Sequence, residues 1–171
     1  MAIGLKIRLQ RLTALWLLIC GFMFTSIPAL AKQVTILPSE EIINIGPDVS
    51  YLSVPDNAIT LQQFRSDQYQ SKLKPTKMDT PSFGFTSDTF WFQTQLVHNG
   101  NQQMSRTLVV SYPLLDHLNV YIVRQQGHVT TFETGDAKPF SERPELHRYF
   151  TFPIDFQPRE TVTLVIEATT S

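Results

Sequence analysis

The sequence predicts an all-β domain, a jelly-roll-like β-sandwich with one short helix. Three observations predict it: short runs with apolar residues at every second position recur along the chain, turn residues separate these runs, and no long helical pattern lies between them. A series of about eight short strands of this kind is typical of two packed sheets.

The alternation is clearest around residue 90, where Phe90, Phe92 and Leu96 alternate with more polar positions. Turn signals such as Asn99-Gly100 and the sequence 125–127 (Gln-Gln-Gly) separate the later runs. The predicted strands are residues 33–37, 41–45, 49–54, 90–96, 107–111, 118–122, 128–134, 150–154 and 162–166.

One segment departs from the β pattern. Thr60 and Gln63 have the spacing of a capping box, and Ile59 with Phe64 fits the hydrophobic staple around it. We therefore expect a short helix from residue 61 to about residue 67, covering one end of the sandwich. The polar stretch 69–81 is expected to be an exposed loop.

The first 31 residues have the pattern of a secretory signal peptide. Basic residues precede an apolar run from Leu12 to Phe24, and a small-x-small cleavage site ends at Ala31. The run has about 13 residues, whereas about 20 are needed to span a bilayer. The predicted organisation is a signal peptide, residues 1–31, followed by an exported domain, residues 32–171.

Composition excludes several classes of function. Cys20 is the only cysteine and lies in the leader, so the domain has neither a disulfide nor a thiolate metal site. The formal net charge is −1, and no basic block follows the leader, so nucleic acid is not an expected partner. His98, His117, His128 and His147 are scattered singly, and the sequence has no Gly-x-Ser-x-Gly elbow. We expect neither a cofactor nor an enzymatic activity.

The loop from Gly135 to Pro144, with the strand that follows, concentrates charged and aromatic residues, as functional loops often do. Two interpretations stay open for these side chains. Arginine binds carboxylates in bidentate fashion, so the group forms either a structural network that holds the loop or a direct ligand contact. The candidates in this loop are Asp136, Glu142, Arg143, His147 and Arg148.

Three further candidates lie earlier in the chain. Trp91 is either a platform on which a sugar ring stacks or a large core residue. Tyr112 opens a corner in which the apolar pair Leu114-Leu115 is expected to pack. Asp116 ends that corner and accepts hydrogen bonds either from sugar hydroxyls or from one of the loop arginines.

Three ordered blocks, residues 83–92, 112–116 and 135–153, resemble the 7TMR-DISM extracellular type 2 domain, a periplasmic sensor domain of seven-transmembrane bacterial receptors. The resemblance covers roughly residues 45–170. It implies a jelly-roll similar to carbohydrate-binding modules, placed between a signal peptide and a seven-helix membrane region. Relatives carry a diguanylate cyclase or histidine kinase in the cytoplasm, so we expect this chain to be part of a longer receptor. Gln93 departs from the arginine that is common in the family.

The resulting hypothesis is a periplasmic input domain that senses a carbohydrate or another small polar ligand for a receptor in the inner membrane. Binding is expected on one sheet face or on the rim that loops 111–117 and 136–148 form. Two alternatives stay open. The domain is a protein-binding or homodimerisation module without a small ligand, or it is an accessory module of a secreted hydrolase.

Overall fold

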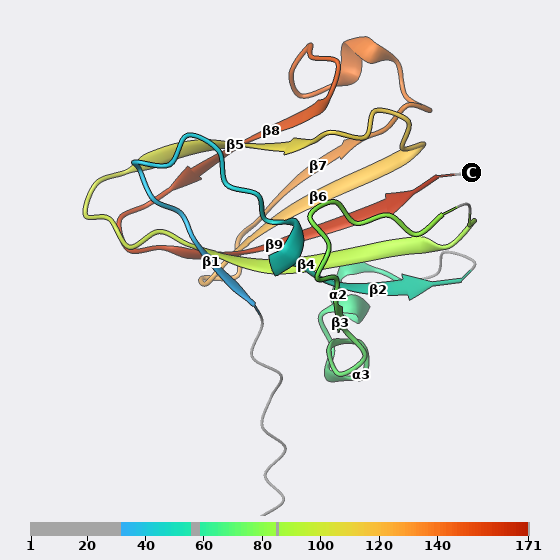
Figure 1. Ribbon diagram of the computed structural model, residues 1–171, viewed down its shortest axis with the longest axis horizontal. Helices are drawn as coiled ribbons and strands as arrows, with labels where there is room; N and C mark the ends of the chain where they lie inside the picture. The colour runs from blue at the N-terminus through green and yellow to red at the C-terminus, as the bar shows by residue number, and fades with distance from the viewer. Residues whose placement is uncertain (1–31, 56–58, 85, 171) are drawn as a thin grey trace, which may run out of the picture. The chain divides into compact units, whose positions relative to one another are not determined.

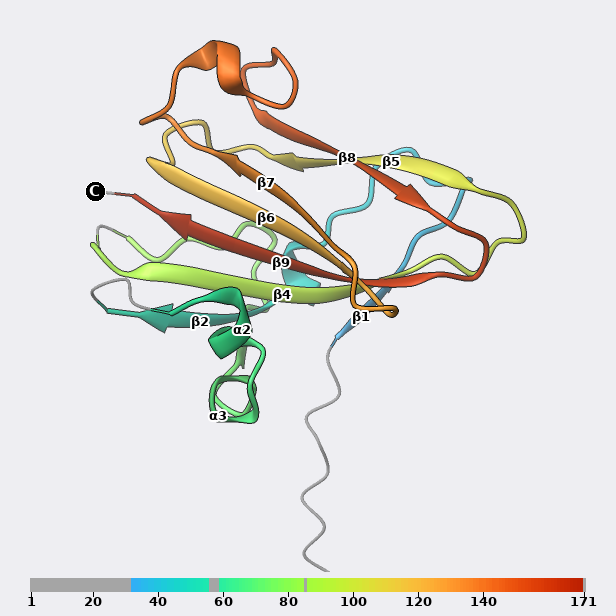
Figure 2. The ribbon, with the colours of Figure 1, turned by 180° about the vertical axis from the view of Figure 1, so that it is seen from behind.

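Two β-sheets of very different width pack face to face (Figures 1 and 2). The computed structural model describes residues 32–55, 59–84 and 86–170. The predicted signal peptide, residues 1–31, and Phe85 of the first family block lie outside the described residues. The predicted all-β sandwich is confirmed. Among the described residues, no helix combines the length and the apolar character needed to cross a membrane.

The wide sheet has seven strands within the described residues, in the order β3-β2-β4-β9-β6-β7, with β1 also paired to β4. All its pairs are antiparallel except the parallel pair of β1 with β4. Its strands are β1 (Gln33–Thr35), β2 (Ser50–Val54), β3 (Lys74–Pro75), β4 (Thr89–Val97), β6 (His117–Arg124), β7 (Val129–Thr134) and β9 (Thr161–Thr169).

The narrow sheet consists of β5 (Met104–Val110) and β8 (Phe150–Phe156), which pair antiparallel. Its apolar residues face one side of the wide sheet and form the main core. The core contains alternate residues of the three long strands β6, β8 and β9, which is what period-2 patterning predicts. From the wide sheet come Leu118, Val120, Ile122, Val162 and Leu164, and from the narrow sheet come Phe150, Phe152, Ile154 and Phe156.

Two short helices, rather than the single one predicted, lie on part of the opposite face of the wide sheet. They are α2 (Leu61–Phe64) and α3 (Asp67–Gln70). The capping box of Thr60 and Gln63 is confirmed, with both reciprocal hydrogen bonds present. Phe64 then packs on Trp91, so α2 covers the outer face and not an end of the sandwich.

Two predicted segments differ from the structure. Residues 41–45 form no strand, because Ile43 and Ile45 satisfy the apolar alternation by packing against the main core from an irregular segment. That segment leads into the short 3-10 helix η1 (Gly46–Asp48), which has proline in its first turn. The predicted loop 69–81 is not wholly exposed, since it contains β3 and the buried Thr76. A second 3-10 helix, η2 (Phe140–Glu142), lies in the long loop before β8.

Candidate functional site

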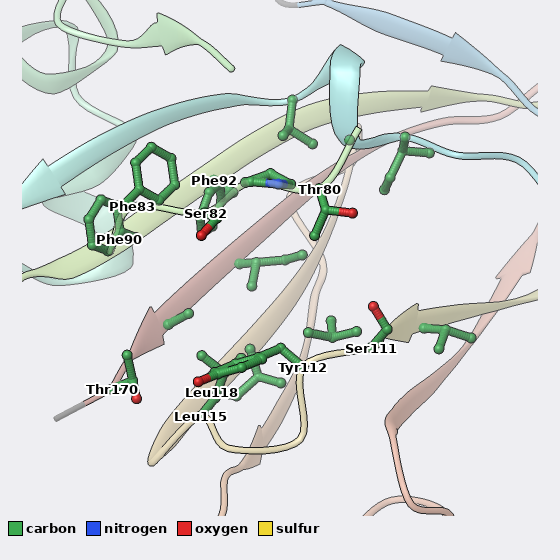
Figure 3. Close-up of a pocket in the computed structure, with 18 of the residues that line it drawn as sticks. Thr80, Ser82, Phe83, Phe90, Phe92, Ser111, Tyr112, Leu115, Leu118 and Thr170 are labelled. Atoms are coloured by element: carbon green, nitrogen blue, oxygen red, sulfur yellow. The ribbon is translucent and has the colours of Figure 1, made fainter. Parts of the chain in front are cut away.

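A cleft opens between the two sheets where the narrow sheet leaves part of the wide sheet uncovered. Its volume is about 610 Å³, within the range of small-molecule sites. The floor is the inner face of β4, β9 and the start of β6, one wall is the loop 79–84, and the other is the end of β5 with the corner that follows. In Figure 3 the phenylalanines of the first side and Tyr112 of the second flank the open space.

Stacked aromatic rings line the first side of the cleft. Phe90 and Phe92 project from the same face of β4, because they are two residues apart. Phe83, from the loop before β4, stacks on Phe90 with ring centroids 4.4 Å apart and lies 6.0 Å from Phe92. Tyr51 of β2 packs behind Phe83 at 4.5 Å. The rings form a continuous apolar surface that extends from the loop wall onto the β4 part of the floor.

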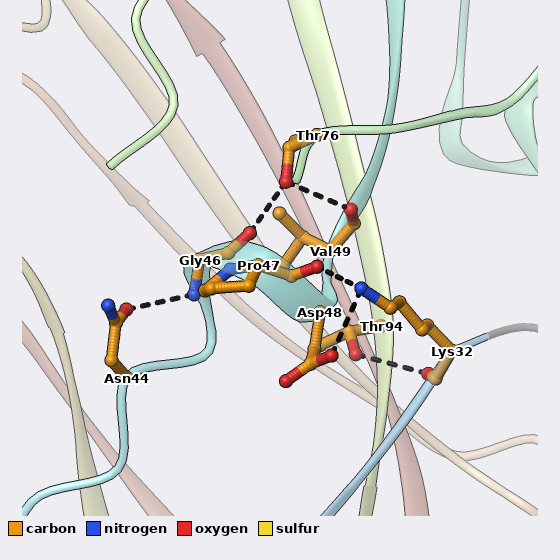
Figure 4. Close-up of polar contacts among 8 residues, drawn as sticks. All are labelled: Lys32, Asn44, Gly46, Pro47, Asp48, Val49, Thr76 and Thr94. Carbon is orange, nitrogen blue, oxygen red and sulfur yellow. Dashed lines mark hydrogen bonds and ion pairs between the residues drawn. The ribbon is translucent and has the colours of Figure 1, made fainter. Parts of the chain in front are cut away.

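The loop that carries Phe83 is tied to η1, as Figure 4 shows in part. Thr76 donates a hydrogen bond to the carbonyl oxygen of Gly46 (2.6 Å), and the carbonyl oxygen of Val49 lies 3.3 Å from the same hydroxyl. A β-carbon on Gly46 would lie only 2.0 Å from the carbonyl oxygen of Asp79, so only glycine allows this approach. Gly84 has a φ of +73°, which favours glycine at the turn after Phe83.

The same region anchors the start of the described chain. Lys32 forms an ion pair with Asp48 (3.1 Å) and donates to the carbonyl oxygen of Pro47. Thr94 donates to the carbonyl oxygen of Lys32 (3.2 Å), which places β1 beside β4 (Figure 4). The cleft wall therefore rests on contacts that connect β1, η1 and β4.

The second wall carries one predicted site residue, Tyr112. Its side chain is 51% exposed and lines the cleft, as do Ser111 and Leu115. Of the apolar pair expected to pack in this corner, Leu115 contacts the core, whereas Leu114 is exposed, so the prediction for Leu114 was wrong. Thr170 donates to the carbonyl oxygen of Leu114 (3.2 Å), which connects the corner to the end of β9.

The polar groups of the cleft are mostly hydroxyls. Asp79 is the one charged side chain among the described residues that line it, and it is exposed. The hydroxyl-bearing lining residues are Thr80, Ser82, Thr86, Ser111, Tyr112 and Thr170, and Asn44 adds an amide whose oxygen accepts from the N–H of Gly46 (3.0 Å). The cleft thus offers hydrogen bonds and apolar contact together.

Trp91 lies on the opposite face of β4 and is 1% exposed. Its indole stacks on Phe64 (4.9 Å between ring centroids) and lies parallel to Tyr121 at 6.1 Å. The structure therefore places Trp91 in a second apolar cluster beneath α2, with no ring face open to a ligand.

Arg143 is the centre of a network of contacts in the loop before β8. Its side chain is 8% exposed, and its guanidinium lies 4.4 Å from the ring centroid of Phe150. It donates to the carbonyl oxygens of His147 (3.0 Å) and Arg148 (3.1 Å). Asp136 pairs with it at 3.7 Å. These contacts hold the loop onto β8, as expected for the structural-network interpretation.

The remaining candidates lie around the Arg143 network and are not part of the cleft lining. Glu142, His147 and Arg148 are exposed, and Arg148 lies over the ring of Tyr149 at 4.4 Å. Asp116 is half-buried, and its carbonyl oxygen accepts from the N–H of Ala137 (3.2 Å). Of the eight predicted site residues, Tyr112 alone lines the cleft.

Sequence reasoning missed the aromatic wall. Phe90 and Phe92 were assigned only to one face of a strand, and Phe83 only to a family block. The signal was present in the spacing, because Phe83 and Gly84 directly precede a strand with two phenylalanines on one face. What the spacing lacked was any indication that this face is left uncovered.

Within the described ranges, no group of three or more His, Cys, Asp or Glu is placed to hold a metal ion. On the outer face, Tyr121 and Asn119 both donate to the Glu167 carboxylate (3.0 Å each). Burial, followed by the nearby Glu167 carboxylate, raises the pKa of Tyr121 above its ordinary value.

The sequence model of the family described as 7TMR-DISM extracellular 2 matches residues 46–171, which include every described strand except β1 and all of the described cleft lining except Asn44 and Ile45. No curated protein and no solved structure matches the chain.

Proposed function

The chain belongs to the 7TMR-DISM extracellular 2 family, and on this premise we propose that the cleft between its sheets is the ligand site of the domain. The family implies a periplasmic sensor domain of a membrane receptor, associated with the transmembrane region of its parent protein. The observation that carries the proposal is the cleft of about 610 Å³ lined from both sheets and a loop.

The ligand class proposed first is a carbohydrate or another small polar molecule with one apolar face. Aromatic rings such as Phe83 and Tyr112 provide surfaces for the apolar face of a sugar, and exposed hydroxyls such as Ser82 and Ser111 accept and donate hydrogen bonds. Arg143 is proposed to position the neighbouring loop, and Glu142, His147 and Arg148 form a second exposed surface for polar contacts.

The position of the cleft suggests how binding reaches the rest of a receptor. Ala168 and Thr170, at the end of β9, line the cleft together with Tyr112 of the corner and Phe83 of the loop. In the family resemblance, the segment after the last strand leads to the membrane helices. A ligand in the cleft therefore contacts the connecting segment directly, and it shifts the receptor to the extent that it prefers one of two states.

A thermal-shift screen of the purified protein tests the proposal. The compounds are sugars, glycan fragments, amino acids and nucleotides, because a ligand that binds only the folded state raises the melting temperature in proportion to the logarithm of its concentration. A concentration-dependent shift that Tyr112→Ala removes and Arg148→Ala retains supports the cleft as the ligand site. A shift that Arg148→Ala removes and Tyr112→Ala retains moves the site to the loop before β8.

A second candidate function is supported by exposed apolar residues in that loop. Phe140 is 53% and Leu146 is 72% exposed in the same loop, and exposed apolar residues that together form one patch mark sites where another protein docks. Under this alternative, the domain contacts a partner protein or its own copy. Sedimentation velocity over a range of protein concentrations tests it: a dimer lost in Leu146→Ser supports the alternative, and a monomer at all concentrations removes self-association.

The wider assignment is also proposed from the resemblance. It includes cleavage of a signal peptide after Ala31, location of the parent receptor in the inner membrane, and a diguanylate cyclase or histidine kinase as its output. N-terminal sequencing of the exported protein tests the first of these. A mature chain that begins at Lys32 supports cleavage at that site.

A further inference from the structure

We infer that the cleft takes a hydrocarbon or aromatic group, and that its ligand is an amphiphile with an uncharged or cationic head. This inference rests on the proposed ligand site and narrows the class of ligand. It follows from three properties of the described lining: an apolar floor, a rim of hydroxyls, and a single negative charge.

The floor of the cleft is formed by apolar side chains. Phe90, Phe92, Leu118, Ile166 and Ala168 are the inward-facing residues of β4, β6 and β9 that line it. The backbones of β4 and β9 pair on both sides along this stretch, so their N–H and C=O groups serve the sheet. The floor therefore provides little for a hydroxyl to bond.

The unpartnered polar atoms agree with this distribution. Among the described residues, the buried side-chain nitrogen and oxygen atoms without a hydrogen-bond partner belong to residues outside the cleft lining, namely Trp91, His98, Arg106, Thr134, Arg143 and Thr151. A sugar hydroxyl placed on the floor would lose its bonds to water without replacement, which is unfavourable. An alkyl chain or aromatic ring gains from the same burial.

The hydroxyls lie at the rim. Thr80 and Ser82 come from the loop wall, Ser111 and Tyr112 come from the β5 side, and all four residues are exposed. Val109, two residues before Ser111, is 51% exposed and extends the apolar lining outward. A ligand that matches this arrangement has an apolar part in the cleft and a polar head between the rim hydroxyls.

Charge selects the head group. The described lining contains no Lys, Arg or His, and its one ionised side chain is Asp79 at the loop wall. An anionic head, such as a carboxylate or a sulfate, would lie near this carboxylate without a cation to balance it. A neutral sugar head or an ammonium head avoids that repulsion, and the ammonium is attracted by Asp79.

Isothermal titration calorimetry with a matched series tests the inference, with each compound below its micelle-forming concentration. Glucose, hexyl glucoside and octyl glucoside vary the apolar part, whereas octyl glucoside, octyltrimethylammonium and octanoate vary the head. Each methylene that enters the cleft tightens binding about fourfold, so octyl glucoside should bind roughly fifteenfold more tightly than hexyl glucoside. Free glucose should bind weakest of the glucosides, and octanoate weakest of the octyl compounds.

Substitution of Asp79 separates head-group selection from general charge effects. Asp79→Lys should reverse the order of octyltrimethylammonium and octanoate, and Asp79→Asn should reduce the difference between them. Glu145→Lys is the matched control, because it makes the same change in net charge at an exposed residue outside the cleft lining. The same reversal in Glu145→Lys would overturn the head-group assignment.

Two further variants locate the bound chain. Ala168→Leu adds a larger apolar side chain to the floor, and Tyr112→Ala removes a wall residue that is 51% exposed. Both should weaken the binding of octyl glucoside at least fivefold. Unchanged affinity in both variants would place the alkyl chain elsewhere and overturn the inference. If glucose, hexyl glucoside and octyl glucoside bind with equal affinity, the ligand is not an amphiphile, and this inference is overturned. The proposed ligand site of the domain would remain. Absence of binding by every compound, here and in the wider screen, removes both.

Discussion

The two faces of strand β4 carry the same kind of residue and have different fates. On the outer face, Trp91 is enclosed between Phe64 of α2 and Tyr121 of β6. On the inner face, Phe90 and Phe92 line an open cleft of about 610 Å³. The difference shows that an aromatic residue on a strand becomes core or surface according to what covers its face, and not according to its own chemistry.

The cover itself differs in kind. A capping box starts α2 at Thr60, and this local signal places Phe64 over Trp91. Over the inner face, the narrow sheet ends at β5, and the loop that carries Phe83 covers only the edge. A wide sheet that faces a narrow one necessarily leaves part of its apolar face without a partner, and that part is where this domain has its cleft.

Replacement of Trp91 tests the comparison most severely. Trp91→Ala should lower the free energy of unfolding by about 3–5 kcal/mol, because it leaves a cavity in a closed cluster. Phe83→Ala, on the cleft wall, should cost about 1 kcal/mol because its ring is only partly buried. Urea denaturation followed by circular dichroism measures both. Equal losses in the two variants would contradict the distinction between a filled and an open face.

Replacement of Arg143 extends the comparison to the loop before β8. Arg143→Ala should lower the free energy of unfolding by about 2 kcal/mol, since it removes charged hydrogen bonds to two carbonyl oxygens. Arg148→Ala, at an exposed side chain, should change it by less than about 0.5 kcal/mol. The same denaturation experiment measures both variants. An unchanged free energy of unfolding in Arg143→Ala would contradict the structural role of Arg143 in this loop.

A pair of glycines tests whether the loop wall matters for binding. Gly84 and Gly127 have φ values of +73° and +85°, and a β-carbon added at either position would have open space within 4 Å. Substitution of either by alanine should cost about 1 kcal/mol through backbone strain. Only Gly84→Ala should also weaken the ligand of the cleft, measured by calorimetry. Equal affinity in the two variants would remove the loop from the site.

The smallest effect is expected on the filled face at alkaline pH. The folded state raises the pKa of Tyr121, so it holds the phenolic proton more strongly than the unfolded chain does. This contribution to stability is complete below the unfolded pKa of about 10 and decreases as the pH rises above it. Tyr121→Phe should therefore lose less stability between pH 9 and pH 11 than the wild type. The control is Tyr112→Phe, and parallel pH profiles for wild type and Tyr121→Phe would contradict the prediction.

Most of the fold follows from local patterns. The alternation of β4, β6, β8 and β9 predicts their existence and their two faces, because a pleated strand places successive side chains on opposite sides. The segment 41–45 shows where this fails. Its isoleucines alternate like those of a strand, yet they reach the core from a chain segment that pairs with no neighbour.

The candidate site was much harder to predict. For Arg143 and Asp136 the sequence leaves two interpretations open, a structural network and a ligand contact, and in the structure Arg143 pairs with Asp136 and fastens the loop to β8. Tyr112, which the sequence places at the start of a corner, lines the cleft. Composition does not tell whether a polar side chain holds the fold or lines a ligand site, because the same side chain can form hydrogen bonds to the protein backbone or to a ligand.

By itself, the sequence determined the class of fold, the start of α2, most strand positions and the family, since these depend on residue periodicity, local capping and ordered motifs. Tertiary structure alone decided which face of β4 stays open and which arginine is enclosed. The physical reason is that covering a face requires partners far apart in the chain: Phe64 covers Trp91, whereas the narrow sheet does not reach Phe90 and Phe92.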